Sequence, residues 1–400
     1  MKKRMASAID FGTSKIVCVI GQQCPTGALE VLSMGQSEYD GIRRGAFVNA
    51  AKVGPALRRA IGIAQDRAHL RIRRTAVGVP GAFVHAGLVR GDAPVRQKDK
   101  RVSMGDMRAA IRAAERFEMP KELELLHSVA QSYQLDGGTA LRKPQGIKAS
   151  VIRAKVSCVL GERAFSQKVQ EILGELHIEV PQFIAIPYVL PLYAIPERER
   201  ENTAVLLDVG AWSTDICIVK NGALSWHSLL KVGGENITND LAQGLDVPRE
   251  QAIQIKKRYV FGLETQAGSG VHPDSRGVQA FSYETIQEIV EARVEELCAL
   301  VRKELGESKV PLSTRSNVYI TGGGLATMRG SREFVEARLQ MPARIFQPDV
   351  SMMHAPYYSS AVSILHHLFT ESEIEGASLR GSRIGLIDRI KRTLNNQGGN

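Results

Sequence analysis

The sequence lacks the features that would assign it to several common classes of protein. No stretch reaches the roughly 18 apolar residues that a membrane-spanning helix needs, although 44% of the residues are hydrophobic. The five cysteines show no spacing typical of metal ligands, so we expect reduced, structural thiols in a cytosolic protein. Lys2, Lys3 and Arg4 lie near the N-terminus, but Asp10 and Lys15 interrupt the apolar stretch that follows, which argues against a signal peptide.

A P-loop is also missing, since no Gly-x-x-x-x-Gly-Lys-Ser/Thr motif occurs. Basic residues outnumber acidic ones, with 52 Lys and Arg against 42 Asp and Glu, which indicates an acidic partner such as nucleic acid or an anionic membrane face. The densest basic cluster, at 67–74, has no interleaved aromatic residues, so we interpret it as a solvated junction between a helix and a strand. A length of 400 residues predicts two or three domains.

Two related stretches occur about two hundred residues apart, at 7–20 and 204–219. Each reads as an apolar strand, an Asp-x-Gly turn with small hydroxyl residues, and a second apolar strand, which predicts a β-hairpin. One Asp-x-Gly is typical of any turn, but two matched copies favour a functional site. The repeat also predicts two equivalent half-domains that face each other.

The turns of these hairpins have the composition of a phosphate site. Glycine lets the backbone approach a ligand closely, and successive N–H groups in a turn form an anion-binding concavity. Thr13, Ser14 and Ser213 add hydroxyl donors. Asp10 and Asp208 end their strands beside the turns, where they are placed to hold a hydrated Mg²⁺, which usually takes one or two carboxylates plus phosphate oxygens.

Two glycine-rich stretches follow in the second half of the chain. Gly233 and Gly234 open a predicted helix, and the triple glycine 322–324 follows a predicted strand at 317–321. A glycine loop just past a strand lets the backbone lie flat against a nucleotide. A bare triple glycine is only moderately specific, but here it is the third loop of this kind in order.

The C-terminal region predicts a separate function. Residues 371–381 are polar and contain Gly and Ser, so we expect a flexible linker. Residues 382–395, read as a helix, have an apolar side and a charged side. A preceding linker, basic flanks and a polar tail favour a helix on a membrane surface over one docked on the protein core. Its membrane-facing residues would be Ile384, Leu386, Ile387, Ile390, Lys391 and Leu394.

The two Asp-Gly hairpins, the Gly-Gly helix start with a downstream Ile255-Lys256, and the late Thr-Gly-Gly-Gly together resemble the actin–Hsp70–sugar kinase ATPase fold. That fold is an α/β, ribonuclease H-like arrangement of duplicated βββαβα domains around a nucleotide cleft. Over almost the whole chain the sequence more closely resembles the bacterial cell-division FtsA family. The hallmark of that family is an inserted α+β subdomain called 1C, which residues 83–160 match in position and length. Residues 127–136 and 356–362 also resemble segments typical of the family.

The resemblance implies a domain organisation that can be read along the chain. In order it comprises subdomain 1A at 1–82, the inserted 1C at 83–160, a return to 1A at 161–200, 2A at 201–233, 2B at 234–305, a return to 2A at 306–345, a closing 1A helix at 346–370, the linker at 371–381, the amphipathic membrane-targeting helix at 382–395 and a disordered tail at 396–400.

The resemblance also implies ATP and Mg²⁺ as cofactors, with Asp10 and Asp208 near the metal. The nucleotide contacts that it implies are Gly12, Thr13, Ser14 and Lys15 at the first turn, Gly210 and Ser213 at the second, Gly234 and Lys256 near ribose and adenine, and Gly322, Gly323 and Gly324 under the nucleoside. Many relatives have small or glycine residues where this chain has Ala211 and Trp212, so Trp212 must point outward if ATP is to bind.

Hydrolysis needs a group that orients the attacking water. Superfamily ATPases often place a Glu or Gln in the segment before the second hairpin, but residues 184–189 contain neither. We therefore assign no catalytic residue and expect at most a very slow ATPase, in which ATP acts as a conformational and polymerisation ligand.

The function implied by the resemblance is that of an ATP-binding, membrane-tethered, actin-like division protein that polymerises and anchors the FtsZ ring. It would be peripheral on the cytoplasmic face of the membrane at the septum. Its partners would be the FtsZ C-terminal peptide on residues 234–305, a second copy through 1C and 2B contacts, anionic lipid and later division proteins, with no nucleic acid. Arg293 is the candidate peptide contact or, alternatively, part of an intradomain ion pair.

Two other functions are open at this point. A sugar kinase of the same superfamily would need a catalytic Asp base in its first domain and no basic tail helix. A pilus-assembly relative shares the fold and the insertion but normally ends without a linker and an amphipathic helix.

Overall fold

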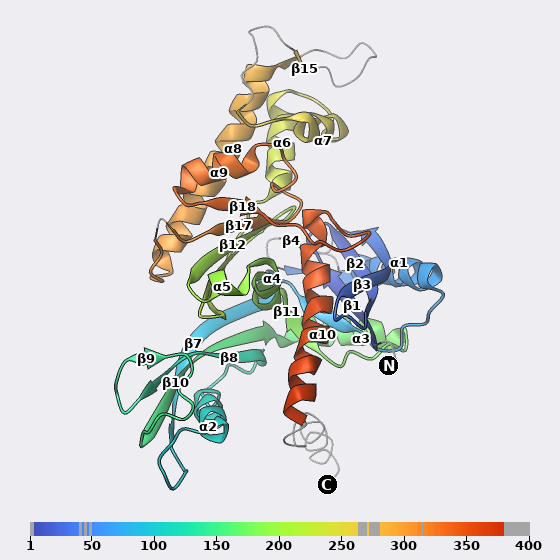
Figure 1. Ribbon diagram of the computed structural model, residues 1–400. Helices are drawn as coiled ribbons and strands as arrows, with labels where there is room; N and C mark the ends of the chain where they lie inside the picture. Colours follow the sequence, from blue (N-terminus) through green and yellow to red (C-terminus); the bar gives the residue numbers. More distant parts are fainter. Residues whose placement is uncertain are drawn as a thin grey trace.

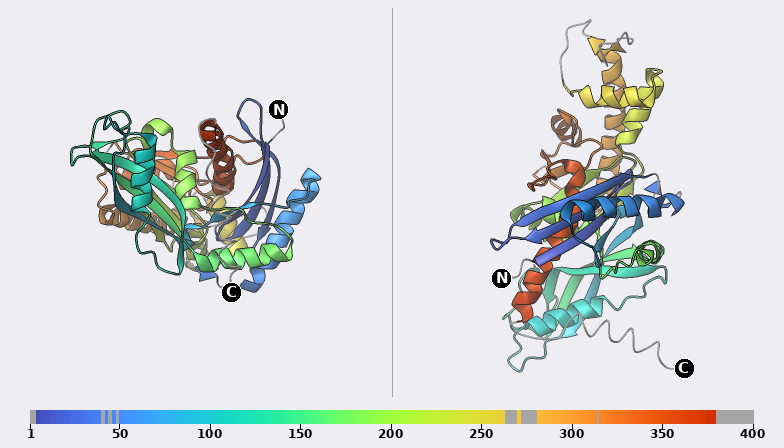
Figure 2. Two further views of the ribbon diagram at one scale, coloured as in Figure 1. Left: turned by 90° about the horizontal axis from the view of Figure 1, so that it is seen from below. Right: turned by 90° about the vertical axis from the view of Figure 1, so that its right-hand side faces the viewer.

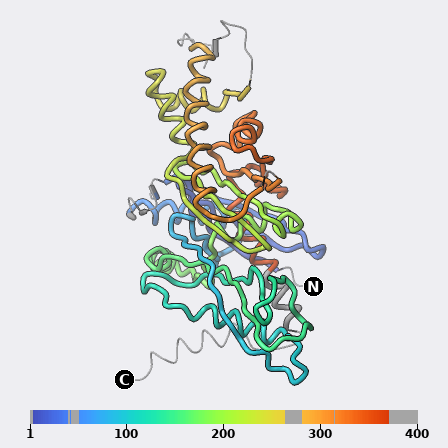
Figure 3. The backbone as a smooth tube through the Cα atoms, turned by 90° about the vertical axis from the view of Figure 1, so that its left-hand side faces the viewer, coloured from blue at the N-terminus to red at the C-terminus, as the bar shows by residue number. Residues whose placement is uncertain are grey.

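The computed structural model describes residues 4–39, 42–43, 46–47, 50–262, 270–271, 281–313 and 315–379. Figure 1 shows an elongated molecule, with the first half beside α10, the second half above and beside it, and a small sheet with α2 at the lower end. Figure 3 shows the same order from another side, with α6, α7 and α8 at one end and the small sheet at the other.

The first half is built on a five-stranded sheet with the order β11-β6-β1-β2-β3. β1 (Arg4–Phe11) and β2 (Lys15–Gln23) form the first predicted hairpin, in which Asp10 lies opposite Val17. β3 (Leu29–Glu38) extends the sheet antiparallel, and β6 (Ala76–Val79) and β11 (Phe183–Ala185) extend it in parallel on the other side. Short strands β4 (Ile42–Arg43) and β5 (Ala46–Phe47) pair with each other.

Helices cover both faces of this sheet. α1 (Ala50–Ala68) packs on β2 and β3, while α10 (Ser359–Leu379) packs on β1 and β2 from the other side, as the left view of Figure 2 shows. Gly35 permits the close approach of α1, because a Cβ there would lie 2.1 Å from the carbonyl oxygen of Ala60. The remaining helices of this half are η1 (Gly81–Phe83), α3 (Arg163–Glu175), α4 (Ile186–Ala194) and η2 (Pro356–Tyr358).

The second half repeats the arrangement, with the strand order β14-β13-β12-β17-β18. β12 (Thr203–Val209), β13 (Thr214–Lys220) and β14 (Ala223–Leu230) are antiparallel, and β17 (Val318–Thr321) and β18 (Ala343–Ile345) add in parallel. Successive side chains of β12 point to opposite faces of the sheet. Leu206 therefore belongs to the hydrophobic core of the first half, while Val205 and Leu207 belong to that of the second. β12 thus contributes to both cores and connects the two halves.

Among the described residues, five helices and a short hairpin complete the second half. α8 (Tyr283–Glu307) packs against both α6 (Gly234–Gly244) and α9 (Ser331–Leu339), and α7 (Arg249–Arg258) packs on α6. α5 (Glu197–Arg200) precedes β12, and β15 (Gly270–Val271) pairs with β16 (Phe281–Ser282). α10 then returns the chain to the first half, where Val362, Ile364 and Leu365 are fully buried.

The insertion has its own antiparallel sheet of order β7-β10-β8-β9 and its own hydrophobic core. Its elements are β7 (Val84–Pro94), α2 (Met104–Ala114), β8 (Leu123–Leu135), β9 (Ala140–Leu141) and β10 (Val151–Glu162). Ser103 caps α2 through a capping box with Asp106. The sheet is fixed to the second half, since the Ser157 hydroxyl donates to the Leu224 carbonyl at 2.5 Å.

The backbone is helical as far as Leu379, which differs from the flexible linker expected over 371–381. The sequence 371–379 contains Glu, Ala and Leu, which favour helix, and no proline that would end it. The predicted amphipathic segment 382–395 and the tail 396–400 lie outside the described residues.

Candidate functional site

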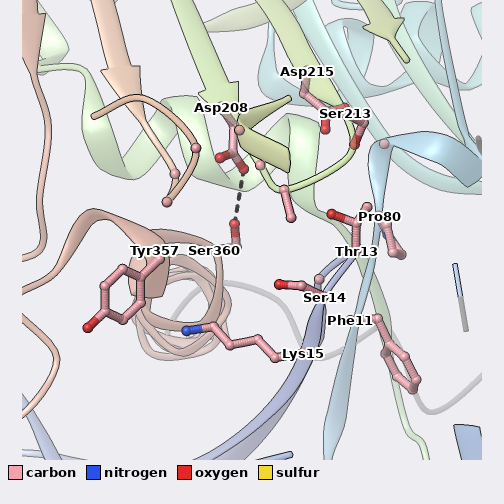
Figure 4. Close-up of a pocket in the computed structure, with 18 of the residues that line it drawn as sticks. Phe11, Thr13, Ser14, Lys15, Pro80, Asp208, Ser213, Asp215, Tyr357 and Ser360 are labelled. Carbon is pink, nitrogen blue, oxygen red and sulfur yellow. Dashed lines mark hydrogen bonds between the residues drawn. The ribbon is translucent and has the colours of Figure 1, made fainter. Parts of the chain in front are cut away.

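A cavity of about 300 Å³ lies where the two hairpin turns, the start of α6 and the loop after β17 meet. Every residue assigned from the sequence to nucleotide or to Mg²⁺ lines this one cavity. In Figure 4, Thr13 and Ser14 of the first hairpin face Asp208 and Ser213 of the second across it. The wall is completed by residues that had no assignment: Phe11, Pro80, Gly81, Ala82, Ile186, Ala211, Asp215, Glu235, Tyr357 and Ser360.

The two turns have the same local geometry. The Gly12 N–H donates to the Lys15 carbonyl at 3.0 Å, and the Gly210 N–H donates to the Ser213 carbonyl at 2.8 Å. The turns also touch each other, because the Trp212 N–H donates to the Thr13 hydroxyl at 3.3 Å across 199 positions of sequence. The repeat in the sequence therefore corresponds to two facing turns in space.

Glycines allow the backbone to close the floor of the cavity. The Gly234 N–H donates to the Gly210 carbonyl at 2.9 Å, and the Gly324 N–H donates to the Val209 carbonyl at 2.7 Å. A Cβ on Gly234 would lie 2.4 Å from the Gly324 Cα, so no other residue fits there without a shift of the backbone. Gly322 has a φ of +85° and lies against Asp208. The triple glycine therefore lies beside one of the two candidate metal ligands.

The two candidate metal ligands are carboxyl groups with raised pKa values. Burial raises the pKa of Asp10 to about 7, and the positive charge of Lys15 opposes this. Burial also raises the pKa of Asp208 to about 7, helped by the negative charges of Asp215 and Asp10 and opposed by a hydrogen bond that the Ser360 hydroxyl donates at 3.3 Å. A nearby cation favours the ionised form of such groups, so the pair fits a divalent ion.

The donor set specifies what kind of ion would fit. Among the described residues, no group of three or more His, Cys, Asp or Glu side chains could hold a metal ion. A metal at Asp10 and Asp208 would therefore have two carboxylates as its protein ligands of these residue types. Mg²⁺ meets that condition, because it keeps several waters and binds through one or two carboxylates and phosphate oxygens.

Two lysines supply positive charge at the cavity. The Lys15 ammonium lies over the ring of Tyr357, 3.9 Å from its centroid, and 4.6 Å from that of Tyr358. Burial lowers the pKa of Lys15 to about 8, opposed by Asp10 and Glu38. Lys256 donates to the Gly234 carbonyl, and burial lowers its pKa to about 8 as well.

Trp212 lies outside the cavity, as nucleotide binding requires. It lines a neighbouring cavity of about 890 Å³ together with Lys52, Asn239 and Ile253, and it is absent from the wall of the first cavity. Its backbone N–H donates to the Thr13 hydroxyl of the facing turn. The Trp212 side chain therefore does not fill the cavity between the two turns.

Comparison with known proteins identifies the family. A model described as cell division protein FtsA matches residues 205–363, and one described as the SHS2 domain inserted in FtsA matches residues 82–160. A cell division protein FtsA of Pseudomonas aeruginosa is 29% identical over 407 residues, covering 97% of each chain, and that of Neisseria meningitidis is 26% identical, covering 99% of each. The chain belongs to the FtsA family.

Solved structures show the fold of this FtsA-family chain. The PilM–PilN type IV pilus biogenesis complex aligns with a TM-score of 0.63 at 16% identity, covering 91% of this chain and 98% of that one. MreB5 of Spiroplasma citri bound to ADP aligns with a TM-score of 0.56 at 12% identity, covering 94% and 99%. These likenesses confirm the actin-like ATPase fold that the sequence predicted.

Asp215 is a site residue that the sequence analysis of this FtsA-family chain missed. It lies opposite Asp208 in the hairpin register, lines the cavity, and its Oδ1 is 2.7 Å from the His227 Nε2. Gly81 leaves room for it, since a Cβ there would lie 1.5 Å from the Asp215 Oδ1. The available signal was a lone acidic residue in an otherwise apolar strand, seven positions after the Asp-x-Gly aspartate.

The expectation of very slow hydrolysis depended on segment 184–189, which contains no Glu or Gln, and did not consider Asp215. Segment 184–189 contributes only the apolar Ile186 to the cavity, as its composition predicts. A carboxylate is nevertheless present on the facing strand, held by His227. The cavity therefore contains a group able to orient water, although the expected segment does not supply it.

Arg293 of this FtsA-family chain forms the intradomain ion pair that the sequence left open. Its Nη2 lies 2.9 Å from Asp240 Oδ1, its Nε lies 2.5 Å from Asp240 Oδ2, and it also contacts Glu296. The pair joins α8 to α6 beside a shallow groove that Ile289 and Gly244 also line.

None of the helices in the described part of this chain combines the length and the apolar composition that spanning a membrane requires.

Proposed function

We propose that this chain binds Mg²⁺-ATP between its two halves, polymerises, and tethers the FtsZ ring to the cytoplasmic membrane. One observation supports the nucleotide part above all others: two turns about two hundred residues apart in the sequence meet at one cavity, each bringing a carboxyl group of raised pKa. Membership of the FtsA family supports the division role.

Different residues of the cavity would contact different parts of the bound Mg²⁺-ATP. Asp10 and Asp208 would hold Mg²⁺, which neutralises phosphate charge when bound. The N–H groups and hydroxyls of the two turns would contact the phosphates together with Lys15. The glycines of the loop after β17 and at the start of α6 would support the nucleoside beside Lys256. Asp215 would orient the attacking water, in a slow ATPase whose nucleotide acts mainly as a ligand for conformation and polymerisation.

The cavity has a direct mechanical connection to the C-terminal region. Lys15 lies on the rings of Tyr357 and Tyr358, and Asp208 accepts from Ser360, so three residues around the start of α10 contact groups of the cavity. α10 runs from there to Leu379, beyond which the sequence predicts the membrane-surface helix. We propose that nucleotide and membrane attachment are coupled through this helix.

Membrane attachment by one chain would be weak and reversible. Each basic residue near an anionic leaflet adds about 1 kcal/mol, and ordering the tail opposes the gain from its apolar side chains. A polymer places many such segments on one surface, which makes attachment firm without any new contact. Polymerisation and tethering would therefore strengthen each other.

The partners follow from the proposed role. The C-terminal peptide of FtsZ would dock on the helices within 234–305, and the FtsA-family chain would sit peripherally at the septal membrane and recruit later division proteins. Arg293 already has two carboxylate partners, so it would reach an acidic peptide only by exchanging one of them.

Vesicle sedimentation tests the proposal. The full chain and a chain ending at Leu379, which keeps every described element, are spun with vesicles of phosphatidylglycerol and phosphatidylcholine, with and without Mg²⁺-ATP and FtsZ. We expect the full chain to pellet, to pellet more with Mg²⁺-ATP, and to carry FtsZ with it, while the shortened chain stays in solution. If neither chain pellets, tethering is contradicted and a pilus-assembly or sugar-kinase role is favoured. If both chains pellet equally, the C-terminal segment is not the anchor.

A further inference from the structure

The far end of the insertion forms a compact surface from two segments, 96–104 and 146–151, which we call the insert tip. Backbone hydrogen bonds join the segments: the Val102 N–H donates to the Ile147 carbonyl at 2.9 Å, and the Ala149 N–H donates to the Lys100 carbonyl at 2.8 Å. Ser103, within the tip, caps the start of α2. The exposed side chains of the tip are therefore held in place by regular structure.

The insert tip is strongly basic. Its exposed cations are Arg96, Lys98, Lys100, Arg101 and Lys148. Asp99 is the exposed acidic residue among them and lies 3.6 Å from Arg101, which is the one salt bridge at the tip among the described residues. Asp106 turns inward instead and accepts from the backbone of Arg96 and Ser103. A second exposed carboxylate, Asp136, accepts from the Val151 and Ser150 N–H groups. These hydrogen bonds, together with the charge of Lys100, lower its pKa. Five exposed cations against two exposed carboxylates still leave the tip with a surplus of positive charge.

Apolar side chains are exposed at the same place. The described part of the chain has six exposed large hydrophobic residues, and three of them belong to the tip: Met104, Ile147 and Val151, at 46%, 44% and 43% exposure. Exposed apolar residues mixed with lysine and arginine are typical of surfaces that bind the headgroup region of an anionic membrane. The tip has no aromatic side chain on which a nucleobase would stack.

The position of the tip agrees with a membrane contact. Figure 1 and the right view of Figure 2 place the loop between β7 and α2 at the same end of the molecule as the C-terminal end of α10. Leu379, where the described part of the chain ends, therefore lies at the end that carries the insert tip.

We infer that the insert tip is a second contact with an anionic lipid surface, separate from the C-terminal segment. Phosphate headgroups meet its cations, while Met104, Ile147 and Val151 enter the interface. Two contacts on one chain fix how the body stands on the membrane, which a single tail does not. The inference rests on the membrane tethering proposed above.

The test compares two triple variants of the full chain. Lys98→Ser, Lys148→Ser and Ile147→Ser together remove two cations and one exposed apolar side chain from the tip. Arg71→Ser, Arg73→Ser and Met5→Ser make the same kind of change at exposed positions elsewhere. With phosphatidylglycerol vesicles, we expect the tip variant to partition about tenfold or more weakly than wild type, and the control variant to change by less than about twofold.

A labelled chain gives a second readout that does not depend on these variants. Gln97→Cys carries an environment-sensitive fluorophore at the tip, in a Cys24→Ser background because the other four cysteines are buried. We expect a blue shift on adding anionic vesicles, and none with the label at Asp66→Cys.

The outcomes separate the two levels of the proposal. If the full chain does not pellet at all, the proposed tethering fails. If it pellets and loses binding on truncation, but the tip variant matches the control and the label at Gln97→Cys does not shift, the second contact is overturned while the tail anchor stands. That second result would point to an acidic protein as the partner of the tip.

Discussion

The two halves of the chain share a hairpin but differ at the position opposite the aspartate. In the first half Asp10 lies opposite Val17, which is buried among apolar neighbours. In the second half Asp208 lies opposite Asp215, which lines the cavity and is held by His227. Both halves therefore supply a candidate metal ligand, while only the second supplies a further carboxylate. In the proposed function, nucleotide binding would be shared between the halves, and any hydrolysis would depend on the second.

Both halves supply a candidate metal ligand, and replacing each of these two aspartates tests that shared feature. Asp10→Asn and Asp208→Asn should each weaken Mg²⁺-dependent ATP binding by at least about 100-fold, since loss of a group that only supports a ligand already costs about 10- to 100-fold. Calorimetry measures the change, with the exposed Asp66→Asn as control. A variant that retains wild-type affinity would remove that residue from the metal site.

The same variants should stabilise the ligand-free protein. The pKa of each carboxyl is about 7 in the folded state against an ordinary value of 3.8, so the unfolded state loses its proton first as pH rises. The destabilisation therefore builds between about pH 4 and 7 and is complete above pH 7. Asn removes it, so the thermal midpoint without nucleotide should rise at pH 8 and stay nearly unchanged at pH 4. A lower midpoint at pH 8 would contradict this sign.

The unequal part of the comparison is tested at Asp215. Asp215→Asn keeps the shape of the side chain and should lower ATP turnover by about 100-fold, within the usual range for a group that transfers or orients a proton, while ATP affinity changes less than about threefold. Steady-state phosphate release and calorimetry measure the two effects, with Glu118→Gln on the insertion as control. Unchanged turnover would exclude Asp215 as the group that orients water.

Lys15 distinguishes the first turn from the second, which has no lysine. Lys15→Met should weaken ATP binding by about tenfold, the loss expected for one hydrogen bond from a charged donor. Because burial lowers the pKa of Lys15 to about 8, the wild-type affinity should fall above about pH 8, and the variant should lose this alkaline decline. An alkaline decline that persists in Lys15→Met would assign it to another group, such as Lys256.

Trp212 distinguishes the second turn and should matter least. Its side chain lines the neighbouring cavity, so Trp212→Gly should change ATP affinity by less than about threefold. A large gain in affinity would mean that the indole enters the phosphate position in solution. Tryptophan fluorescence on adding Mg²⁺-ATP, with Trp226 as the other tryptophan of the chain, gives an independent check.

Much of the fold followed from the sequence because the information was local. Each hairpin is encoded by consecutive apolar residues and an Asp-x-Gly turn, and the glycines at 233–234 and 322–324 mark places where backbones meet. The repeat then fixed the relation between the halves. Asp215 escaped notice because its role depends on strand register and on Gly81, a residue 134 positions away that leaves room for it.

At the C-terminal end of α10, the local composition predicted a linker where the structure has a helix as far as Leu379. The glycine and serines of 371–381 indicate a linker, but a helix that starts on the first sheet propagates through helix-favouring residues at little further cost. Arg293 illustrates a third limit, since spacing alone could not distinguish a partner contact from the pair with Asp240.

The most direct test of the central claim is calorimetric titration of the nucleotide-free full chain with Mg²⁺-ATP at pH 7.5. Binding of one nucleotide per chain, lost in both Asp10→Asn and Asp208→Asn, is the result expected from two facing turns that share one metal. No heat of binding, together with no nucleotide in the purified protein, would contradict it.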